Sequence, residues 1–190
     1  AKVLSVLKGK AKSVGLYGPL VRLRSRFNDY QLELRAEKEL YSPFVKGGQL
    51  VFDVGANVGR KSEAFLELGA RVVSFEPQPA CAEEIKLRCG SPEKLNVHVC
   101  AIGAEETTAQ LDVSNRSGLA HIASNSEANQ TIEVEVHPLD RFVAEYGMPT
   151  FCKIDVEGYE LEVLKGLSEL PEALSFEYHT TSQEEVDHAL

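Results

Sequence analysis

The sequence has no apolar run that approaches the roughly 20 residues needed to span a bilayer. Its first 16 residues are interrupted by lysines and lack the long apolar centre of a secretory signal. Four cysteines are present, and they form no C-x-x-C pair and no metal-finger spacing. Cys100 and Cys152 lie in apolar runs, where a free cysteine behaves as a small hydrophobic residue. These absences predict a reduced, cytoplasmic compartment.

Basic residues are scarce outside a short N-terminal segment. Residues 1–28 hold seven basic residues and no acidic one, so the remainder holds 13 basic against 29 acidic residues. A formal charge of −16 on that remainder repels phosphate backbones, which argues against a nucleic-acid partner. Two interpretations of the basic segment stay open: contact with an anionic partner or membrane surface, or a solvated helix with its lysines turned outward.

The rest of the composition is typical of one globular domain, with 43% hydrophobic and 26% charged residues. Residues 1–47 are expected to form a helical lead-in, with its clearest helix at Tyr30–Leu40. From Gln49 onward, short apolar runs alternate with amphipathic segments, which predicts βαβ units and a parallel sheet over residues 48–190. The expected strands are Leu50–Asp53, Arg71–Phe75, Leu95–Ala101, Thr150–Ile154 and Ala173–Glu177, with extra strands at Thr107–Val113 and Thr131–Val136; the expected helices are Val58–Leu68, Pro79–Cys89, Glu160–Leu167 and one capped by Asp140 that runs to Tyr146.

The most informative run is VFDVGANVG at residues 51–59, in which an apolar strand ends at an acid and turns through glycines into a helix. Gly55 allows the backbone to approach a ligand, and Gly59 permits close packing between helix and strand. The full G-x-G-x-x-G spacing of a pyrophosphate cradle is absent. Asp53 would repel a pyrophosphate but attract the ammonium of S-adenosylmethionine, so the run, including Asn57, predicts a site for that cofactor.

Two further segments extend the expected cofactor site. Glu76 follows the second strand, where a carboxylate can accept both ribose hydroxyls, and Pro77 fixes the turn after it. After the third strand, Ala101 and Ile102 precede Gly103, and small side chains there can flank an adenine. A solvated Glu76 and a plain turn at Gly103 are the structural alternatives.

With these stretches in place, the sequence resembles the FkbM family of methyltransferases. The resemblance implies a Rossmann-like α/β sheet of order 3-2-1-4-5, S-adenosylmethionine as methyl donor, and O-methylation of a hydroxyl on a sugar or polyketide-type small molecule. KIDVEG is its most distinctive element. The matching segments, in the family's order, are VFDVGANVG (51–59), SFEP (74–77), CAIG (100–103), VEVHPLDRF (134–142), KIDVEGYELEVLKG (153–166) and SFEYH (175–179).

The sequence departs from the family pattern in two loops and at its end. His137 stands where the family often has threonine, and Ala120-His121 where small hydroxyl residues are common. Both loops are expected to face the methyl acceptor. The chain ends after the fifth expected strand, whereas this fold usually continues into two more. We therefore expect a C-terminally truncated or abbreviated sheet, whose open edge would favour either a homodimer or instability.

Catalytic candidates are the polar residues that follow the fourth and fifth strands, because ligands of open α/β sheets bind beyond the carboxyl ends of the strands. Asp155 is expected to contact the amino-acid end of the cofactor or the acceptor. Glu157 and His179 are the candidate general bases, although Glu157 also suits a first helical turn and His179 also suits a strand exit. Lys153 is expected to pair with a neighbouring carboxylate. The sequence has no dedicated metal-ligand spacing.

Three other functions stay open at this point. A nucleotide- or dinucleotide-binding oxidoreductase uses a similar sheet, and a non-catalytic module can retain the fold. A nucleic-acid methyltransferase is supported by the basic N-terminal segment alone.

Overall fold

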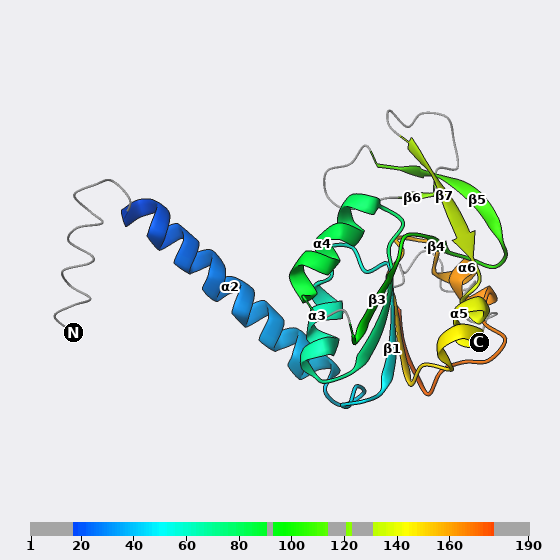
Figure 1. The fold of residues 1–190 in the computed structure, drawn as a ribbon, viewed down its shortest axis with the longest axis horizontal. Helices are drawn as coiled ribbons and strands as arrows, with labels where there is room; N and C mark the ends of the chain where they lie inside the picture. The colour runs from blue at the N-terminus through cyan, green and yellow to red at the C-terminus, as the bar shows by residue number, and fades with distance from the viewer. Residues whose placement is uncertain (1–16, 91–92, 114–120, 123–130, 177–190) are drawn as a thin grey trace.

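Five parallel strands form the centre of the protein (Figure 1). The computed structural model describes residues 17–90, 93–113, 121–122 and 131–176, and for residues 17–27 and 121–122 it describes the backbone alone. The strand order β3-β2-β1-β8-β9 confirms the expected order 3-2-1-4-5. These strands are β1 (Leu50–Val54), β2 (Arg71–Phe75), β3 (Leu95–His98), β8 (Phe151–Ile154) and β9 (Ala173–Phe176).

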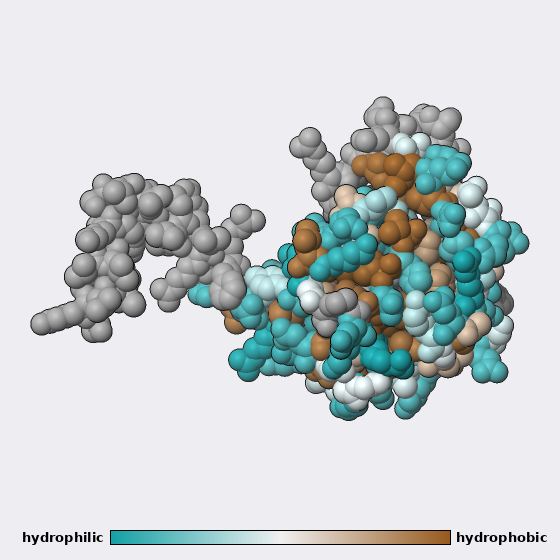
Figure 2. Space-filling model, in the orientation of Figure 1, coloured by the Kyte–Doolittle hydropathy of each residue, from teal (hydrophilic) through white to brown (hydrophobic). Residues whose placement is uncertain are grey.

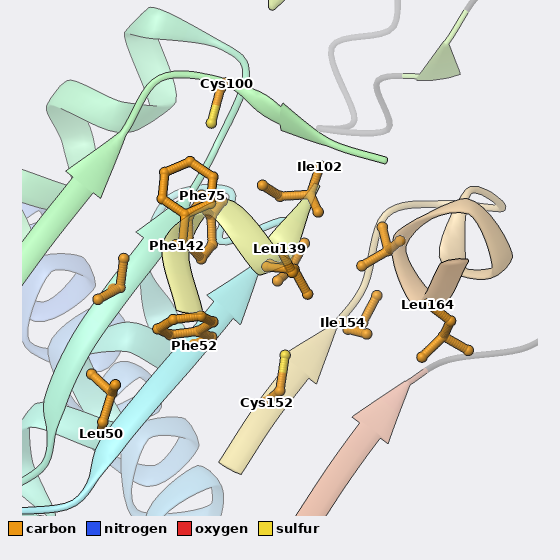
Figure 3. Close-up of a cluster of buried hydrophobic side chains, with 13 residues drawn as sticks. Leu50, Phe52, Phe75, Cys100, Ile102, Leu139, Phe142, Cys152, Ile154 and Leu164 are labelled. Atoms are coloured by element: carbon orange, nitrogen blue, oxygen red, sulfur yellow. The ribbon is translucent and has the colours of Figure 1, made fainter. Parts of the chain in front are cut away.

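Helices cover both faces of this sheet, so its central strands are apolar at almost every position. Successive side chains of a strand point to opposite faces. Phe52 accordingly packs in the cluster of α5 and α6, which Figure 3 shows, while Val51 packs on the other face with Phe65 of α3. The four covering helices are α3 (Arg60–Glu67), α4 (Pro79–Cys89), α5 (Leu139–Tyr146) and α6 (Glu160–Lys165).

The N-terminal helix α2 (Tyr17–Tyr41) is longer than the expected Tyr30–Leu40, and Figure 1 shows its first turns projecting from the body. Its C-terminal half packs on α3. Lys38 Nζ lies 2.5 Å from Glu67, and Tyr41 at the helix end is buried against Phe65. Within the part of the chain that the structure describes, no helix has the length and apolarity to cross a membrane.

The extra strands expected at Thr107–Val113 and Thr131–Val136 are present as β5 and β7, and they belong to a separate small sheet. This second sheet has the order β4-β7-β5-β6 and lies beyond the carboxyl end of the main sheet (Figure 1). The antiparallel pair β5–β7 forms its centre. The strands are β4 (Ala101–Ile102), β5 (Thr107–Asp112), β6 (His121–Ile122) and β7 (Thr131–His137).

The expected third strand, Leu95–Ala101, was too long. β3 ends at His98, whose carbonyl accepts the N–H of Glu76 at 3.0 Å. Ala101 and Ile102 instead pair in parallel with β7, and Gly103 N–H donates to His137 O at 3.1 Å. The chain therefore changes sheets between His98 and Ala101, which the continuous strand-like pattern of residues 95–101 does not reveal.

The cysteine expectations agree with the structure. All four cysteines, Cys81, Cys89, Cys100 and Cys152, are free thiols, and Cys100 and Cys152 are buried among apolar side chains. Burial raises the pKa of the Cys100 thiol to about 12, so this thiol is not a reactive thiolate at neutral pH.

The sequence suggested that Asp140 caps α5, but in the structure it does not. The residue before the helix is Pro138, and Asp140 lies in the first turn. Its carboxylate accepts the backbone N–H of Ser168 at 2.9 Å and also the Ser168 hydroxyl. Asp140 therefore connects α5 to the segment that follows α6.

Replacing Asp140 by alanine is expected to lower the free energy of unfolding by about 1 kcal/mol, because one hydrogen-bonded tie is lost on a partly exposed surface. Urea denaturation measures the change. Ser168→Ala in the Asp140→Ala background should then cost little more, since the two residues act as a pair. Full additivity of the two losses would contradict this role.

Candidate active site

A cavity opens at the carboxyl ends of β1, β2 and β8, where the small sheet faces the main sheet. In Figure 2, apolar surface runs up the middle of the visible face, from the part of the protein built on the main sheet toward the small sheet. The cavity is lined by Val54, Gly55, Asn57, Phe75, Glu76, Pro77, Gln78, Cys100, Ala101, Ile102, Leu111, Asp155, Val156, Glu157 and Tyr159.

The β1–α3 turn forms one lip of this cavity. The N–H groups of Gly55 and Ala56 both donate to Phe75 O, at 3.0 and 3.1 Å, which ties the turn to β2. Gly55 has a φ of +71°, and a Cβ there would lie 1.9 Å from the carbonyl oxygen of Asp155. The glycine is therefore required by the approach of the β8–α6 loop, a reason the sequence alone did not supply. Asn57 follows at a positive φ of 50°.

Glu76 lies at the tip of β2 and lines the cavity, as expected, with 4% of its surface exposed. The backbone N–H of Asn57 donates to Oε2 at 2.8 Å, and that of Gln78 donates to Oε1 at 2.9 Å. Burial raises the pKa of the Glu76 carboxyl, and the two N–H groups oppose this shift. Each oxygen keeps acceptor capacity for a second donor, and the side chain is fixed in direction.

Asp53 does not lie on the cavity, which corrects the expectation of a direct ligand contact. Its carboxylate is fully buried; Oδ2 accepts the Ser62 hydroxyl at 2.6 Å, and Oδ1 lies 3.3 Å from Lys153 Nζ. Gly59 also lies outside the cavity, and a Cβ there would come 3.0 Å from Ile85 of α4. Gly59 therefore allows close packing against helix α4, rather than the helix–strand packing that the sequence suggested.

Lys153 pairs with neighbouring carboxylates, as expected, and it has two of them. Its ammonium group lies 3.3 Å from Asp53 Oδ1 and 3.3 Å from Asp155 Oδ2. It also donates to the carbonyl oxygen of Gly55 at 3.0 Å. Burial by itself would lower the pKa of Lys153, but the two carboxylates more than offset that effect, so the pKa lies above its ordinary value.

The β8–α6 loop forms the opposite lip and brings Asp155 and Glu157 to the cavity together. Asp155 N–H donates to Val54 O at 3.1 Å, and its side chain remains 28% exposed. Glu157 has a φ of +54°, a conformation that is unusual for a residue other than glycine. Glu160 Oε1 accepts the N–H groups of Val156 and Gly158, each at 3.1 Å, which fixes the loop.

An apolar wall completes the cavity. Ala101 and Ile102 contribute to it, as expected, although they belong to β4 rather than to the main sheet. Leu111 of β5 and Tyr159, next to α6, also line it, and both were missed at the sequence level. Tyr159 follows the KIDVEG motif directly, so its position was available from the sequence. Leu111 belongs to none of the motifs, and its strand is placed by its pairing with β7.

The remaining sequence candidates are not among the described residues that line the cavity. His137, expected at the acceptor, does not line the cavity; it is buried with its Nδ1 beside Glu106 and Nε2 3.2 Å from Glu135. Its position is thus accounted for by the carboxylate of Glu135 on its own strand β7 and by that of Glu106, which lies just before β5. His179, the second candidate base, and the side chains of Ala120 and His121 lie outside the described residues.

Comparison with known proteins supplies the family. The model of the methyltransferase FkbM domain matches residues 53–190. The 2-O-methyltransferase NoeI of Sinorhizobium fredii is 25% identical over 203 residues, which cover 91% of this chain and 84% of that protein.

The solved structure of precorrin-6y C5,15-methyltransferase from Geobacter metallireducens GS-15 aligns with this chain with a TM-score of 0.48 and 9% sequence identity. The alignment covers 84% of this chain and 67% of that one. The family match spans the cavity and both of its lips, from Asp53 through the β8–α6 loop. The protein is a methyltransferase that belongs to the FkbM family.

Proposed function

We propose that the protein transfers the methyl group of S-adenosylmethionine to a hydroxyl oxygen of a small molecule, of the sugar or polyketide type. The observation that carries the proposal is that two carboxylates line one cavity: the buried carboxylate of Glu76, and that of Asp155 on the β8–α6 loop. The name of the relative NoeI, a 2-O-methyltransferase, supports oxygen as the methylated atom.

The lining residues fit a cationic nucleoside. Glu76, Asp155 and Glu157 are the charged side chains among the described lining residues, so the cavity favours a sulfonium and an ammonium by Coulomb attraction. The same charges disfavour a dinucleotide pyrophosphate, which argues against the oxidoreductase alternative. Beside these carboxylates, the apolar wall formed by Ala101 and Ile102 suits an uncharged adenine ring.

Each lining group then has a defined place in binding. Glu76 accepts the ribose hydroxyls, because its two backbone donors aim it from the β2 tip while each oxygen retains a lone pair. Asp155 accepts hydrogen bonds from the ammonium group at the amino-acid end of S-adenosylmethionine. Gly55, Asn57 and Pro77 contribute the backbone surface between these two points.

The methyl donor, when bound, supplies a methyl group activated by the adjacent sulfonium. The protein aligns the acceptor oxygen with that methyl group, and alignment of this kind is worth roughly 7–11 kcal/mol in favourable systems. The acceptor hydroxyl must also lose its proton, and Glu157 and His179 are the proposed general bases. Glu157 lines the cavity, so it can receive the proton there.

Glu76→Gln tests the cofactor assignment. The change removes the charge and places an amide NH₂ against a backbone N–H, either that of Asn57 or that of Gln78. We expect the Kd for S-adenosylmethionine, measured by calorimetry, to rise about tenfold or more, a loss of about 1.4 kcal/mol. 5′-Methylthioadenosine, which keeps the ribose but has no amino-acid end, should lose affinity to the same extent.

The control is Glu83→Gln, which removes one exposed negative charge from α4 and should leave both Kd values unchanged. An unaltered affinity in Glu76→Gln would refute the ribose contact. Wild-type protein that binds NAD or NADP but neither S-adenosylmethionine nor 5′-methylthioadenosine would refute the proposed function as a whole.

A further inference from the structure

Lys153 occupies a position between the two lips of the cavity. Its side chain is 4% exposed, and its ammonium lies within 3.4 Å of four oxygen atoms. Two belong to the carboxylates of Asp53 and Asp155, and two are the carbonyl oxygens of Val54 and Gly55. One cation thus contacts the end of β1, the β1–α3 turn and the first residue after β8.

Such a buried cation needs partners, because removing an ammonium from water costs several kcal/mol unless it is paired. Asp53 alone would satisfy that need on the interior side. The contact with Asp155 has a different consequence, since Asp155 is partly exposed and lines the cavity. Lys153 contacts Asp155 Oδ2 from the buried side of the loop, and this contact determines the direction of the carboxylate.

We propose that Lys153 is a positioning residue, which holds the Asp155 carboxylate and the Gly55 turn in the geometry that receives the ammonium of the methyl donor's amino-acid end. This inference rests on the proposed function.

Charge balance supports the arrangement. Asp53, Lys153 and Asp155 together carry one net negative charge, because Asp53 compensates the lysine from the buried side. Asp155 therefore keeps attraction for an incoming ammonium, although it is already paired. Asp53 acts on the ligand through Lys153, which gives the acid at the end of β1 a role despite its full burial.

The alternative is that Lys153 only neutralises the buried charge of Asp53. A double-mutant cycle separates the two roles. The variants are Lys153→Met, Asp155→Asn and the pair together, and the readout is the calorimetric Kd for S-adenosylhomocysteine, which carries the same amino-acid end. We expect Lys153→Met to weaken binding about tenfold or more, and to cost nothing further when Asp155 is already asparagine.

The affinity for 5′-methylthioadenosine, which has no ammonium, should change by less than about twofold in all three variants. Additive losses in the cycle, or equal losses for both ligands, would overturn the inference. Wild-type protein that does not bind S-adenosylhomocysteine would overturn the proposed function first, and the inference with it.

Lys153→Met leaves Asp53 buried and unpaired, so it is expected to be less stable than the wild type. Asp53→Asn/Lys153→Met removes both buried charges and keeps the fold testable by thermal unfolding. With Asp53→Asn as its matched reference, this variant should still bind S-adenosylhomocysteine about tenfold more weakly. Recovery to the affinity of Asp53→Asn would show that Lys153 only compensates Asp53.

Discussion

Asp155→Asn is expected to raise the Kd for S-adenosylmethionine about a hundredfold, because it removes the charge from a hydrogen bond to an ammonium, worth about 2–3 kcal/mol. The amide is almost isosteric with the carboxylate, and the backbone of this residue stays tied to β1 through Val54. The fold should therefore persist, and calorimetry on the purified variant measures the loss directly.

The choice of ligands identifies which part of the methyl donor Asp155 contacts. S-adenosylhomocysteine lacks the sulfonium charge but keeps the ammonium, so its affinity should fall as far as that of S-adenosylmethionine. 5′-Methylthioadenosine should bind as it does to the wild type. A loss confined to S-adenosylmethionine would place Asp155 at the sulfonium instead and contradict the assignment.

Glu162→Gln is the matched control for charge. Glu162 lies in α6, pairs with Lys165 and does not line the cavity, so its replacement should leave all three Kd values unchanged. A fall in affinity in this variant comparable to that of Asp155→Asn would mean that overall negative charge, rather than one contact, governs binding.

Gly55→Ala is expected to destabilise the protein by about 4 kcal/mol or more, which places it among the exceptional single substitutions. The new Cβ would lie 1.9 Å from the carbonyl oxygen of Asp155 and 2.9 Å from its carbonyl carbon. Both are backbone atoms, so no side-chain rotation relieves the clash, and the two lips must separate. Urea denaturation measures the stability, and calorimetry the accompanying loss of ligand affinity.

Gly48→Ala separates this clash from the cost of a left-handed backbone. Gly48 has a φ of +83°, close to that of Gly55, and no atom lies within 4 Å of where its Cβ would be. Its replacement should therefore cost only about 1–2 kcal/mol. Equal losses at the two positions would show that the close approach of the lips contributes nothing.

Most elements of the central sheet followed from the sequence, because the relevant signals are local, whereas the order of its strands came from the resemblance to the FkbM family. The apolar runs that became β1 and β2, the glycines of the turn after β1 and the acid at the β2 tip each depend on residues close together in the chain. Glu76 was thus placed correctly from its position after an apolar strand alone.

The direction in which Asp53 faces was decided only by the tertiary structure. An acid at a strand end can point toward the ligand or toward the covering helix, and the sequence does not distinguish these. Asp53 points to the helix side because Ser62 of α3 and Lys153 of β8, 100 residues further along the chain, supply its partners there. For that reason Asp53 is buried and does not line the cavity.

What the sequence determined by itself is the parallel sheet and the segments that follow its strands at the carboxyl edge. The second sheet and the cavity wall that includes Leu111 arose from pairing between strands that lie far apart in the chain. Local patterns fix secondary structure because backbone hydrogen bonding and alternation of side chains have short periods. Which side chains share a cavity depends on long-range packing, and for that reason Lys153 became visible as a link between the two lips only in the folded protein.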